Sequence, residues 1–494
     1  MVLPKLDRDS QEPMYRQLYQ QIMRLIDEGS LPAGERLPPT RVLAEKLAVN
    51  RTTVCRAYQE LWALGYLESR PGGYSTVRAR MRPVAARKRP GASLIDWDQA
   101  TAPESRRICE DLLAHTPRPV GASEPINFSG LAADRELCPL DDFRRSLKHA
   151  LATDGKRLLD YGDPAGYPPL REVIARRMRT HGVTVTAEEI LITGGSQQAL
   201  DLVVRLITRP LSCIAVESPT YSHAIPLFRF HGLLMQEAPM RPDGLDLDVL
   251  ADWLATQRPA LVYTIPNFHN PTGITTSQAH REALLAMCER HRVPILEDGF
   301  EEEMKYFGKA VLPIKSMDEG GIVIYLGTFS KVVFPGLRVG WIAADRECIK
   351  RLLALSRFSN LSGSMLGQAA LAHFCEDGHY EQYLRRVHGA YRRRMQAMLH
   401  GLRQYLPERG VEWTQPAGGY TLWVKVAPTS ASITEKELLE RLRQAGVLAT
   451  PGRLFFPAEP DGLGFRLSIS NLREPQIHEG CRRLGRALAS VVGG

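Results

Sequence analysis

Apolar residues near the N-terminus recur at helical spacing. Met14, Leu18, Ile22 and Leu25 lie three or four residues apart, which predicts a helix over residues 13–29. After a turn rich in proline and glycine, the pattern predicts two shorter helices and then two short strands with the sequences Y-L-E-S and Y-S-T-V. A helix, a helix–turn–helix and a hairpin in this order predict a winged helix-turn-helix domain.

The two shorter helices have recognisable starts. We expect the first over residues 41–47 with Thr40 as its N-cap, and the second over residues 51–64 with Asn50 as its N-cap. Threonine and asparagine suit this position because their side-chain oxygens accept a hydrogen bond from a free N–H group of the first turn. Gly65 supplies the C-terminal stop of the second helix.

From about residue 122 to the end, short runs of β-branched residues alternate with amphipathic helical stretches. Strands that alternate with helices predict a doubly wound α/β domain with a mostly parallel sheet. A segment of this length exceeds one such domain, so we expect a smaller C-terminal α/β subdomain from about residue 390 to 494. The predicted strands lie at residues 190–193, 213–217, 260–265, 293–298 and 322–326.

Clear periodicity is lost between these two parts. The segment V-R-A-R-M-R-P-V-A-A-R-K-R-P-G-A is basic and contains proline, which favours a semi-extended, flexible linker over a helix. We therefore divide the chain into a winged-helix domain at residues 12–78, a basic linker at 79–121 and an α/β domain at 122–494.

The net positive charge of the chain is concentrated near the N-terminus. The chain has 63 Lys and Arg against 55 Asp and Glu, a net charge of +8, and residues 1–90 hold 16 and 9 of these. A basic segment joined to a nearly neutral body is typical of a module that binds a polyanion. A solvated charged surface is the alternative interpretation.

Composition excludes several other classes of protein. With 494 residues, 44% of them hydrophobic, the chain is long enough for two or three globular domains. No stretch approaches 18 consecutive apolar residues and the N-terminus lacks the apolar segment of a secretory signal, so we expect no membrane partner. The eight cysteines are scattered singly, which favours a reducing, cytoplasmic location over disulfides, and we expect no bound metal.

The predicted recognition helix opens with polar residues that can contact DNA. Its N-terminal turn is the part that enters the major groove, where arginine reads guanine edges and threonine hydroxyls hold phosphate. The glycines of the predicted wing tip allow close approach to a groove. A three-helix adaptor with no role at nucleic acid is the alternative. The candidate DNA-contacting residues are Arg36, Arg41, Asn50, Arg51, Thr52, Thr53, Arg56, Gly72 and Gly73.

Residues 12–77 resemble the GntR family of bacterial winged-helix regulators. The matching stretches are P-M-Y-R-Q-L-Y, the L-P-x-T-R segment, R-T-T-V-x-R-A-Y and L-x-x-x-G-Y-L-E. Pro39 stands where that family often has a serine, which removes one phosphate contact. The resemblance implies binding to double-stranded DNA.

The most informative stretch of the α/β domain is residues 325–338, Y-L-G-T-F-S-K-V-V-F-P-G-L-R. Lys331 follows a buried strand, and its amine can form a Schiff base if its surroundings lower its pKa. Arg338 is a permanent cation for a phosphate, and Thr328 and Ser330 add hydroxyl donors. The Lys331 amine at one end and the phosphate-binding groups at the other are suited to hold one small anionic cofactor. Taken alone, the Ser-Lys pair is as typical of an exposed surface.

Other segments supply further contacts that pyridoxal 5′-phosphate needs. Gly195, Ser196 and Gln197 stand at a predicted helix N-terminus, where backbone N–H groups and the helix dipole hold phosphate. Tyr221 offers a ring that can stack on the pyridine face. Taken singly, the glycine pair is weak evidence and the tyrosine is more typical of a core.

Two strand ends complete the predicted cofactor site. Asn270 lies in the turn N-P-T-G and can donate to the phenolate oxygen of the cofactor. Asp298 ends the strand V-P-I-L-E-D, on the side where ligands bind such sheets. A carboxylate against the pyridine nitrogen keeps the ring an electron sink. A helix cap is the alternative role of Asp298. We therefore predict Lys331 and Asp298 as the catalytic residues.

The order and spacing of these motifs over residues 125–494 resemble the fold-type I aminotransferases. The resemblance implies that Tyr161, in Y-G-D-P-A-G-Y-P-P-L-R, reaches the phosphate of a neighbouring subunit. It also implies that Arg466, in G-F-R-L-S-I-S, grips the carboxylate of a substrate as a bidentate fork. Phe300 departs from the family, whose members commonly carry a tyrosine there that bonds the phenolate oxygen. That departure puts efficient turnover, but not cofactor binding, in doubt.

A GntR-type winged helix, a basic linker and an aminotransferase-like domain together resemble the MocR family of bacterial transcriptional regulators. The resemblance implies a homodimer with pyridoxal 5′-phosphate bound to Lys331. A small amino-compound effector would form an external aldimine, free the lysine and place its carboxylate on Arg466. Closure of the effector domain would then change promoter occupancy.

Two alternatives remain open at this point. The chain could be a working class I/II aminotransferase that its N-terminal module only localises on DNA. It could instead sense pyridoxal 5′-phosphate itself and govern vitamin B6 synthesis. The sequence identifies neither the effector nor the operator, and it does not separate an activator from a repressor.

Overall fold

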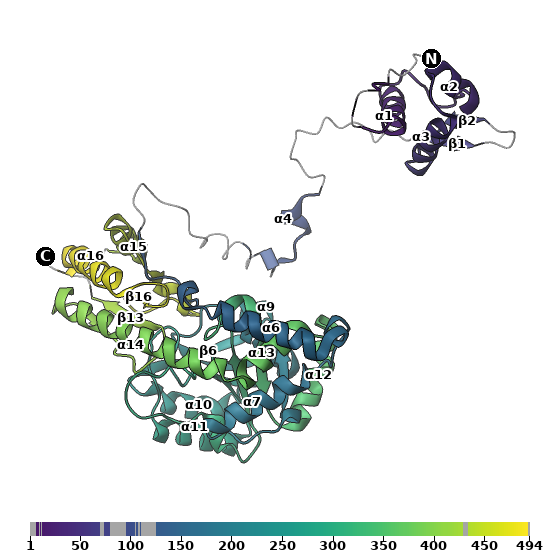
Figure 1. Ribbon diagram of the computed structural model, residues 1–494. Coiled ribbons are helices and arrows are strands. Elements are labelled where there is room, and N and C mark those ends of the chain that lie inside the picture. Colours follow the sequence, from purple (N-terminus) through teal and green to yellow (C-terminus); the bar gives the residue numbers. More distant parts are fainter. Residues whose placement is uncertain are drawn as a thin grey trace. The chain divides into compact units, whose positions relative to one another are not determined.

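The computed structural model describes residues 6–8, 10, 12–69, 74–79, 95–103, 105–106, 109, 125–427 and 433–492. The chain divides into two compact units, residues 1–100 and 101–494, and each is described by itself (Figure 1). Within the described ranges, no helix combines the length and the apolar character that crossing a membrane requires.

The N-terminal unit is a winged helix-turn-helix, as predicted. Its three helices precede an antiparallel hairpin of two short strands, which forms the wing. The apolar stripe of the first helix is buried, with Leu18 and Ile22 packed against residues of the other two helices. The elements are α1 (Met14–Asp27), α2 (Thr40–Leu47), α3 (Arg51–Ala63), β1 (Leu67–Ser69) and β2 (Ser75–Val77), and a short helix α4 (Trp97–Ala100) ends the unit.

One predicted helix cap is confirmed and the other is wrong. The Asn50 side chain caps α3 by accepting a hydrogen bond from the Thr52 N–H group (3.0 Å). Helix α2 begins one residue earlier than predicted, at Thr40, and Pro39 precedes it without any side-chain cap. Proline, whose φ is fixed, suits a position next to a helix start.

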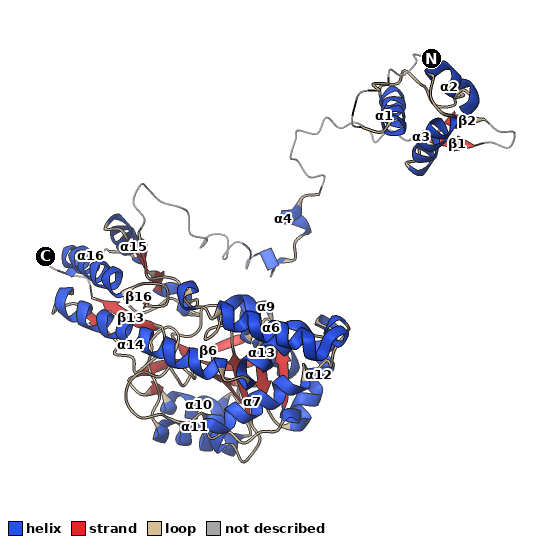
Figure 2. Cartoon of the chain, in the orientation of Figure 1, coloured by secondary structure: helices blue, strands red, loops and turns tan. Residues whose placement is uncertain are grey.

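The large part of the second unit is built on an eight-stranded mixed sheet with the strand order β4-β11-β10-β9-β8-β5-β6-β7. Figure 2 shows its strands in red among the blue helices. The central pairs are parallel, as predicted, whereas β11 is antiparallel to both of its neighbours. The strands are β4 (Ile190–Thr193), β5 (Cys213–Ser218), β6 (Leu234–Arg241), β7 (Gly244–Leu245), β8 (Val262–Thr264), β9 (Ile295–Asp298), β10 (Val323–Thr328) and β11 (Gly340–Ala343).

Helices cover both faces of this sheet. Alternate residues of β10 show this: Ile324 and Leu326 pack on one face with α8, α9 and α12, while Val323 and Tyr325 pack on the other. A strand buried on both faces is nearly all apolar, as the β10 sequence is. The helices are α6 (Leu140–Asp154), α7 (Pro168–Thr180), α8 (Ser196–Ile207), α9 (Ala224–Phe230), α10 (Leu247–Thr256), α11 (Gln278–His291), α12 (Arg346–Ser359) and α13 (Met365–Glu376).

A second, smaller sheet lies toward the C-terminus, with the order β12-β13-β16-β15 and antiparallel pairing throughout. Helices α14 and α16 pack against each other beside it (Figure 1). The elements are α14 (His379–Tyr405), β12 (Val411–Trp413), β13 (Thr421–Val426), α15 (Glu435–Gln444), β14 (Val447–Leu448), β15 (Thr450–Pro451), β16 (Leu463–Ser468) and α16 (Glu474–Val492).

The start of the second unit pairs with this C-terminal region. Strand β3 (Ile126–Asn127) runs parallel to β14, more than 300 residues away along the chain. The sequence pattern did not predict this pairing, because a strand of two residues has no periodicity. The described residues of this unit also include the 3-10 turns η1 (Arg135–Leu137), η2 (Gly155–Leu159), η3 (Ala187–Glu189), η4 (Ile314–Met317), η5 (Pro335–Leu337) and η6 (Gly452–Phe455).

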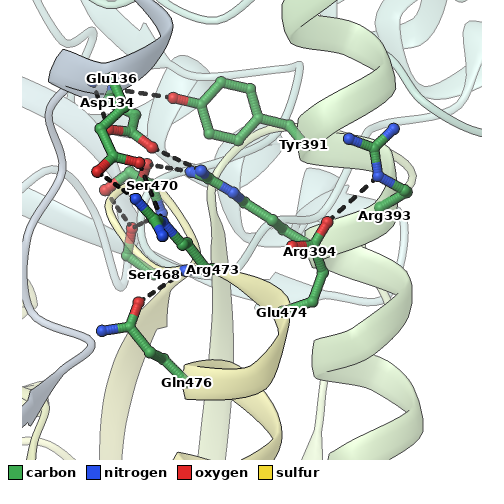
Figure 3. A network of polar contacts seen from close by, with 10 residues as sticks. All are labelled: Asp134, Glu136, Tyr391, Arg393, Arg394, Ser468, Ser470, Arg473, Glu474 and Gln476. Atoms are coloured by element: carbon green, nitrogen blue, oxygen red, sulfur yellow. Dashed lines mark hydrogen bonds and ion pairs between the residues drawn. The ribbon is translucent and has the colours of Figure 1, made fainter.

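A polar network attaches the segment that follows β3 to α14 and to the residues after β16 (Figure 3). Arg394 donates to the Asp134 carboxylate (2.5 Å) and to the Ser470 carbonyl (2.9 Å). The Asp134 N–H group donates to the Tyr391 hydroxyl (3.0 Å). These bonds fix the path of residues 129–134, which line the site described next.

Candidate functional site

Lys331 lies just after the carboxyl end of β10, in the turn that leads toward η5. Its Nζ atom donates to the Leu131 carbonyl (2.9 Å), and the side chain is half-buried. Burial lowers the pKa of Lys331 below the usual lysine value, although Glu301 and Asp298 act against this shift. A lysine with a lowered pKa is more often uncharged, and an uncharged amine is the nucleophilic form.

Asp298 ends β9, the parallel neighbour of β10, and pairs in register with Leu326. Its carboxylate is 4% exposed; Oδ2 accepts from the Tyr263 hydroxyl (2.9 Å), while Oδ1 is buried without a hydrogen-bond partner. Burial raises the pKa of Asp298 to about 6. A buried carboxylate oxygen without a hydrogen bond costs free energy of folding. The Oδ1 atom of Asp298 therefore indicates a place for a hydrogen-bond donor that the protein itself does not supply.

The N-terminus of α8 lies beside Arg338. No side chain caps this helix, and Arg338 donates to the carbonyl of Gly194 (2.7 Å). Gly195 has φ of +110°, and a Cβ atom there would lie 2.8 Å from Arg338 Nη2, so only glycine leaves the guanidinium its place. Ser196 and Gln197 form the first turn. Free N–H groups of a helix start next to an arginine make an anion site.

Two hydroxyl groups border the turn that carries Lys331. The Thr328 hydroxyl donates to the Val339 carbonyl (3.2 Å) and accepts from the Ser330 N–H group (3.1 Å), so its own role within the chain is to hold the turn. The Ser330 hydroxyl is buried and has no partner. Of these two predicted donors, Ser330 is therefore the one left available to a ligand.

Tyr221 follows β5 at the same edge of the sheet. Its ring stacks on that of His223, with 5.4 Å between the ring centroids and 19° between the planes. Burial raises the pKa of the Tyr221 hydroxyl, and the charge of Asp298 adds to the shift, which puts the two residues within electrostatic range.

Asn270 and Arg466 join the two sheets. Arg466, on β16, donates from Nη1 to the Asn270 Oδ1 atom (2.9 Å) and from Nη2 to the carbonyl of Ser129 (3.0 Å) and the hydroxyl of Thr450 (3.1 Å). Its Nε atom is buried and unpartnered. Burial lowers the pKa of Arg466 to about 10. A buried guanidinium without a carboxylate in hydrogen-bond contact is suited to receive one from a ligand.

Sequence reasoning missed two parts of this site. The carbonyl groups of Ser129, Gly130 and Leu131 accept hydrogen bonds from Arg466, Ser470 and Lys331, and no side-chain motif marks such a segment. Glu301 is fully buried, and its charge interacts with those of Lys331 and Arg466. The run E-E-E after Phe300 is the signal in the sequence that could have pointed to Glu301.

Two other residues named in the sequence analysis, Phe300 and Tyr161, have different surroundings from the groups described above. Phe300 is 7% exposed and packs in the core cluster below α8, where it offers no polar group. Tyr161 is 79% exposed, in the loop between η2 and α7, and is not gathered with the other site residues of its own chain.

The predicted DNA-contacting residues of the winged helix are largely exposed. Arg51 and Thr52 stand at the start of α3, Arg41 in the first turn of α2 and Arg36 just before it. The guanidinium of Arg56 lies over the ring of Tyr15, 4.0 Å from its centroid. That of Arg36 lies over Tyr74 at 5.4 Å. Thr53 is half-buried. Gly72 and Gly73 lie outside the described residues.

Comparison with known proteins accounts for both units. Residues 14–77 match the model of bacterial regulatory proteins of the gntR family, and residues 129–484 match that of aminotransferase class I and II. The chain is 30% identical over 492 residues, which is all of both chains, to "Uncharacterized HTH-type transcriptional regulator YdfD" of Bacillus subtilis (strain 168). It is 30% identical to "Probable rhizopine catabolism regulatory protein MocR" of Rhizobium meliloti, over 98% of this chain and 96% of that one.

A solved structure resembles the second unit. It is the α-aminoadipate aminotransferase LysN of Thermus thermophilus, in complex with N-(5'-phosphopyridoxyl)-L-leucine. The TM-score is 0.72 and the sequence identity 32%, over 80% of this chain and 99% of that one. The two family matches together span both described units, and full-length relatives share their order. The chain therefore belongs to the MocR family of transcriptional regulators, in which a GntR-type DNA-binding domain precedes an aminotransferase class I and II domain.

Proposed function

We propose that this regulator binds pyridoxal 5′-phosphate covalently at Lys331 and responds to a small amino compound by changing its affinity for double-stranded DNA. The observation that carries the proposal is that three groups lie at one edge of the large sheet. They are the Lys331 amine with its lowered pKa, the unpartnered Oδ1 atom of Asp298, and the uncapped start of α8 beside Arg338. This arrangement fits the three ends of one cofactor: an aldehyde, a pyridine nitrogen and a phosphate.

Each cofactor contact can be assigned to a group that the chain leaves free. Asp298 Oδ1 would accept from the pyridine nitrogen, and Asn270, whose oxygen already accepts from Arg466, has its amide N–H groups for the phenolate oxygen. Tyr221 would cover one face of the ring. The phosphate would take the N–H groups of Gly195, Ser196 and Gln197 together with Arg338 and the unpartnered hydroxyl of Ser330, beside Thr328.

When bound, pyridoxal 5′-phosphate supplies an aldehyde that joins to primary amines and a ring that withdraws electrons. Lys331 would hold the group in place through its amine until an effector amine takes over the attachment. The released Lys331 side chain then regains a proton. Arg466 would turn its Nη1 group from Asn270 and present it, together with the unpartnered Nε group, to the effector carboxylate as a bidentate fork.

The small sheet connects the binding of an effector to the rest of the molecule. Arg466 belongs to β16 and bridges to Asn270 of the large part, so a ligand carboxylate that displaces Asn270 changes a contact between the two sheets. A ligand shifts such an equilibrium only by its difference in affinity for the two states. We propose that this change reaches the winged helix through the linker of residues 79–121 and alters promoter occupancy.

A homodimer completes the proposed cofactor site. The large apolar or aromatic side chains of Leu159, Tyr161, Phe358 and Leu361 are between 61% and 88% exposed. Gly162 lies directly against Met365, so the segments that carry these residues adjoin. Exposed large apolar side chains on adjoining segments are typical of an interface. We propose that a second copy covers it and that Tyr161 reaches the partner's phosphate site.

The test uses the full-length chain and DNA that this chain selects from a random-sequence pool. Affinity for the selected DNA is measured at one salt concentration for the apo protein, the protein with pyridoxal 5′-phosphate, and the same with each of a panel of amino acids and amines. The proposal expects at least one amine to change the affinity of the wild type but not of Lys331→Ala. Equal affinities for every amine contradict it, and a change with the cofactor alone would favour a sensor of pyridoxal 5′-phosphate.

Catalysis of amino transfer is a second candidate function. The observation in its favour is that the site holds a lysine, a buried aspartate and a carboxylate-binding arginine together. Phe300 weighs against efficient turnover, because it leaves the site without a hydroxyl at that position. Multiple turnovers of a keto acid to an amino acid by the wild type, lost in Lys331→Ala, would establish this function.

A further inference from the structure

Three consecutive glutamates follow Phe300, and their side chains go to three different places. Glu302 accepts from the Asn267 amide (2.7 Å). Glu303 accepts from Arg177 (2.7 Å). Glu301 is 0% exposed; its Oε2 atom accepts from the Tyr420 N–H group (3.1 Å), while its Oε1 atom is buried and has no hydrogen-bond partner. Among these three carboxylates, only that of Glu301 has a buried oxygen without a hydrogen-bond partner.

The charged groups that face Glu301 are those of the candidate site. They come from four elements or their ends: Lys331 after β10, Arg466 on β16, Asp298 on β9, and the hydroxyl-bearing Tyr420 before β13, with Tyr306 close by. Glu301 is the acid that most stabilises the charged forms of both Lys331 and Arg466. Burial raises the pKa of Glu301 to about 8. The pKa of the Glu301 carboxyl is thus raised and that of the Lys331 amine lowered, so the proton affinities of this acid and this base lie closer together than in water.

We propose that Glu301 is a positioning residue for Lys331, whose buried carboxyl exchanges a proton with the lysine amine through intervening water and so sets the pH range in which that amine is uncharged. The step moves one proton from the Lys331 ammonium to the Glu301 carboxylate. Two charged groups become two neutral groups, and no proton enters or leaves the protein.

Burial explains why the neutral forms of Glu301 and Lys331 can compete with their charged forms. Two charges withdrawn from water lose solvation, and their mutual attraction offsets this loss only where further hydrogen bonds complete both groups. Glu301 has one such bond, from Tyr420, and Lys331 one, to Leu131. Asp298 is less suited to the same exchange because its unpartnered Oδ1 atom is the one assigned to the pyridine nitrogen in the proposed function. This inference rests on the proposed function, in which Lys331 is the point of attachment.

The experiment compares the full-length wild type with Glu301→Gln and, as the matched control, Glu302→Gln. Glutamine is nearly isosteric and keeps an oxygen for the Tyr420 N–H group. The rate at which acetic anhydride modifies the Lys331 amine, followed by peptide mass mapping, is measured between pH 5 and 10 without any cofactor. We expect the midpoint of the profile to fall by about one pH unit or more in Glu301→Gln, because an opposite charge is lost. Glu302→Gln should leave it unchanged. An unshifted midpoint in Glu301→Gln overturns the inference.

A second measurement does not depend on substituting Glu301. Infrared spectra of the wild type report the protonated carboxyl groups that titrate near neutral pH, and Lys331→Ala removes the cation that favours ionisation of Glu301. We expect part of that carboxyl signal to titrate at higher pH in Lys331→Ala, and identical titrations in the two proteins would overturn the inference.

Two measurements distinguish a failure of the proposed function from a failure of the role given to Glu301. If pyridoxal 5′-phosphate and borohydride leave no adduct on Lys331 although the acetylation profile shifts, the proposed function fails and the proton exchange stands. If the adduct forms and the profiles of wild type and Glu301→Gln coincide, the proposed function stands and the role of Glu301 fails.

Discussion

Asp134 and Arg394 form an ion pair in which both side chains are at most 10% exposed (Figure 3). Arg394 belongs to α14, and Asp134 precedes η1, in the segment that supplies the carbonyl groups facing Lys331 and Arg466. The pair therefore fixes one wall of the candidate site from outside it.

The first prediction concerns this pair. Asp134→Asn should lower the free energy of unfolding by about 3 kcal/mol or more, because it leaves the buried Arg394 guanidinium without its carboxylate. Denaturant unfolding of the second unit measures this loss. Glu474→Ala is the control, since the ion pair of Glu474 with Arg393 is exposed and is worth at most about 1 kcal/mol. Equal losses in the two variants would contradict the structural role given to Asp134.

The second prediction concerns the anion site at α8. Gly195→Ala and Gly308→Ala both place a side chain at a positive φ, so each should cost about 1 kcal/mol of stability. Only Gly195→Ala brings its Cβ atom against Arg338 and forces the guanidinium to move, because nothing lies within 4 Å of a Cβ atom at position 308. We expect Gly195→Ala alone to weaken retention of pyridoxal 5′-phosphate, by about tenfold. Equilibrium dialysis gives the comparison, and equal retention by both variants counts against the phosphate site.

The third prediction is a pH dependence. Burial by itself would raise the pKa of Glu303, but bonds and charge from His181 and Arg177 more than offset this and lower it to about 2. Burial and the charge of Arg177 lower the pKa of His181, but the hydrogen bond to Glu303 and the charges of Glu303 and Glu302 more than offset this and raise it. The Glu303 contribution to stability is thus present above pH 4.5 and lost as the pH falls toward 2. The His181 contribution is present below pH 6.5 and lost as the pH rises through its folded-state pKa.

Glu303→Gln should therefore destabilise the protein by roughly 3 kcal/mol near pH 6, and by less both below pH 4.5 and once the pH has risen through the folded-state pKa of His181. Denaturant unfolding at several pH values measures the difference from the wild type. A difference that does not vary with pH would mean that packing, and not charge, stabilises this position.

The fourth prediction separates helix capping from DNA contact at Asn50. Its side chain accepts from both the N–H group and the hydroxyl of Thr52. Asn50→Ala should cost about 1 kcal/mol of stability in the winged helix. Asn50→Asp keeps the cap and should leave stability unchanged, yet the added negative charge should weaken DNA binding. Normal DNA affinity of Asn50→Asp would place this residue away from the phosphate backbone.

The sequence was informative where periodicity and strand ends carry the signal. The apolar runs at 190–193 and 322–326 are strands of one mostly parallel sheet, so their carboxyl ends meet at one edge. The strand pattern therefore agrees with the motifs that led us to expect Asp298, Lys331 and the start of α8 at one site. Their roles toward a cofactor stay predictions until a ligand is tested.

What the sequence did not reveal depends on long-range contacts of the backbone. The pairing of β3 with β14 and the carbonyl groups of Ser129 and Leu131 involve main-chain atoms, which every residue has. The orientation of Glu301 depends on Tyr420, which lies 119 residues further along the chain. No local pattern distinguishes it from Glu302 or Glu303.

The antiparallel strand β11 has a consequence for how a signal can arise. Gly340 pairs with Thr328 on one side and Thr193 on the other, and a Cβ atom there would lie 2.8 Å from the Gly195 backbone. The turn bearing Lys331 and the anion site at α8 are thus held at a constant separation by two ladders of main-chain bonds. Arg466 sits on the other sheet and is free of these ladders. Arg466 and the small sheet can therefore change position when a ligand binds, whereas the turn bearing Lys331 and the anion site stay fixed relative to each other.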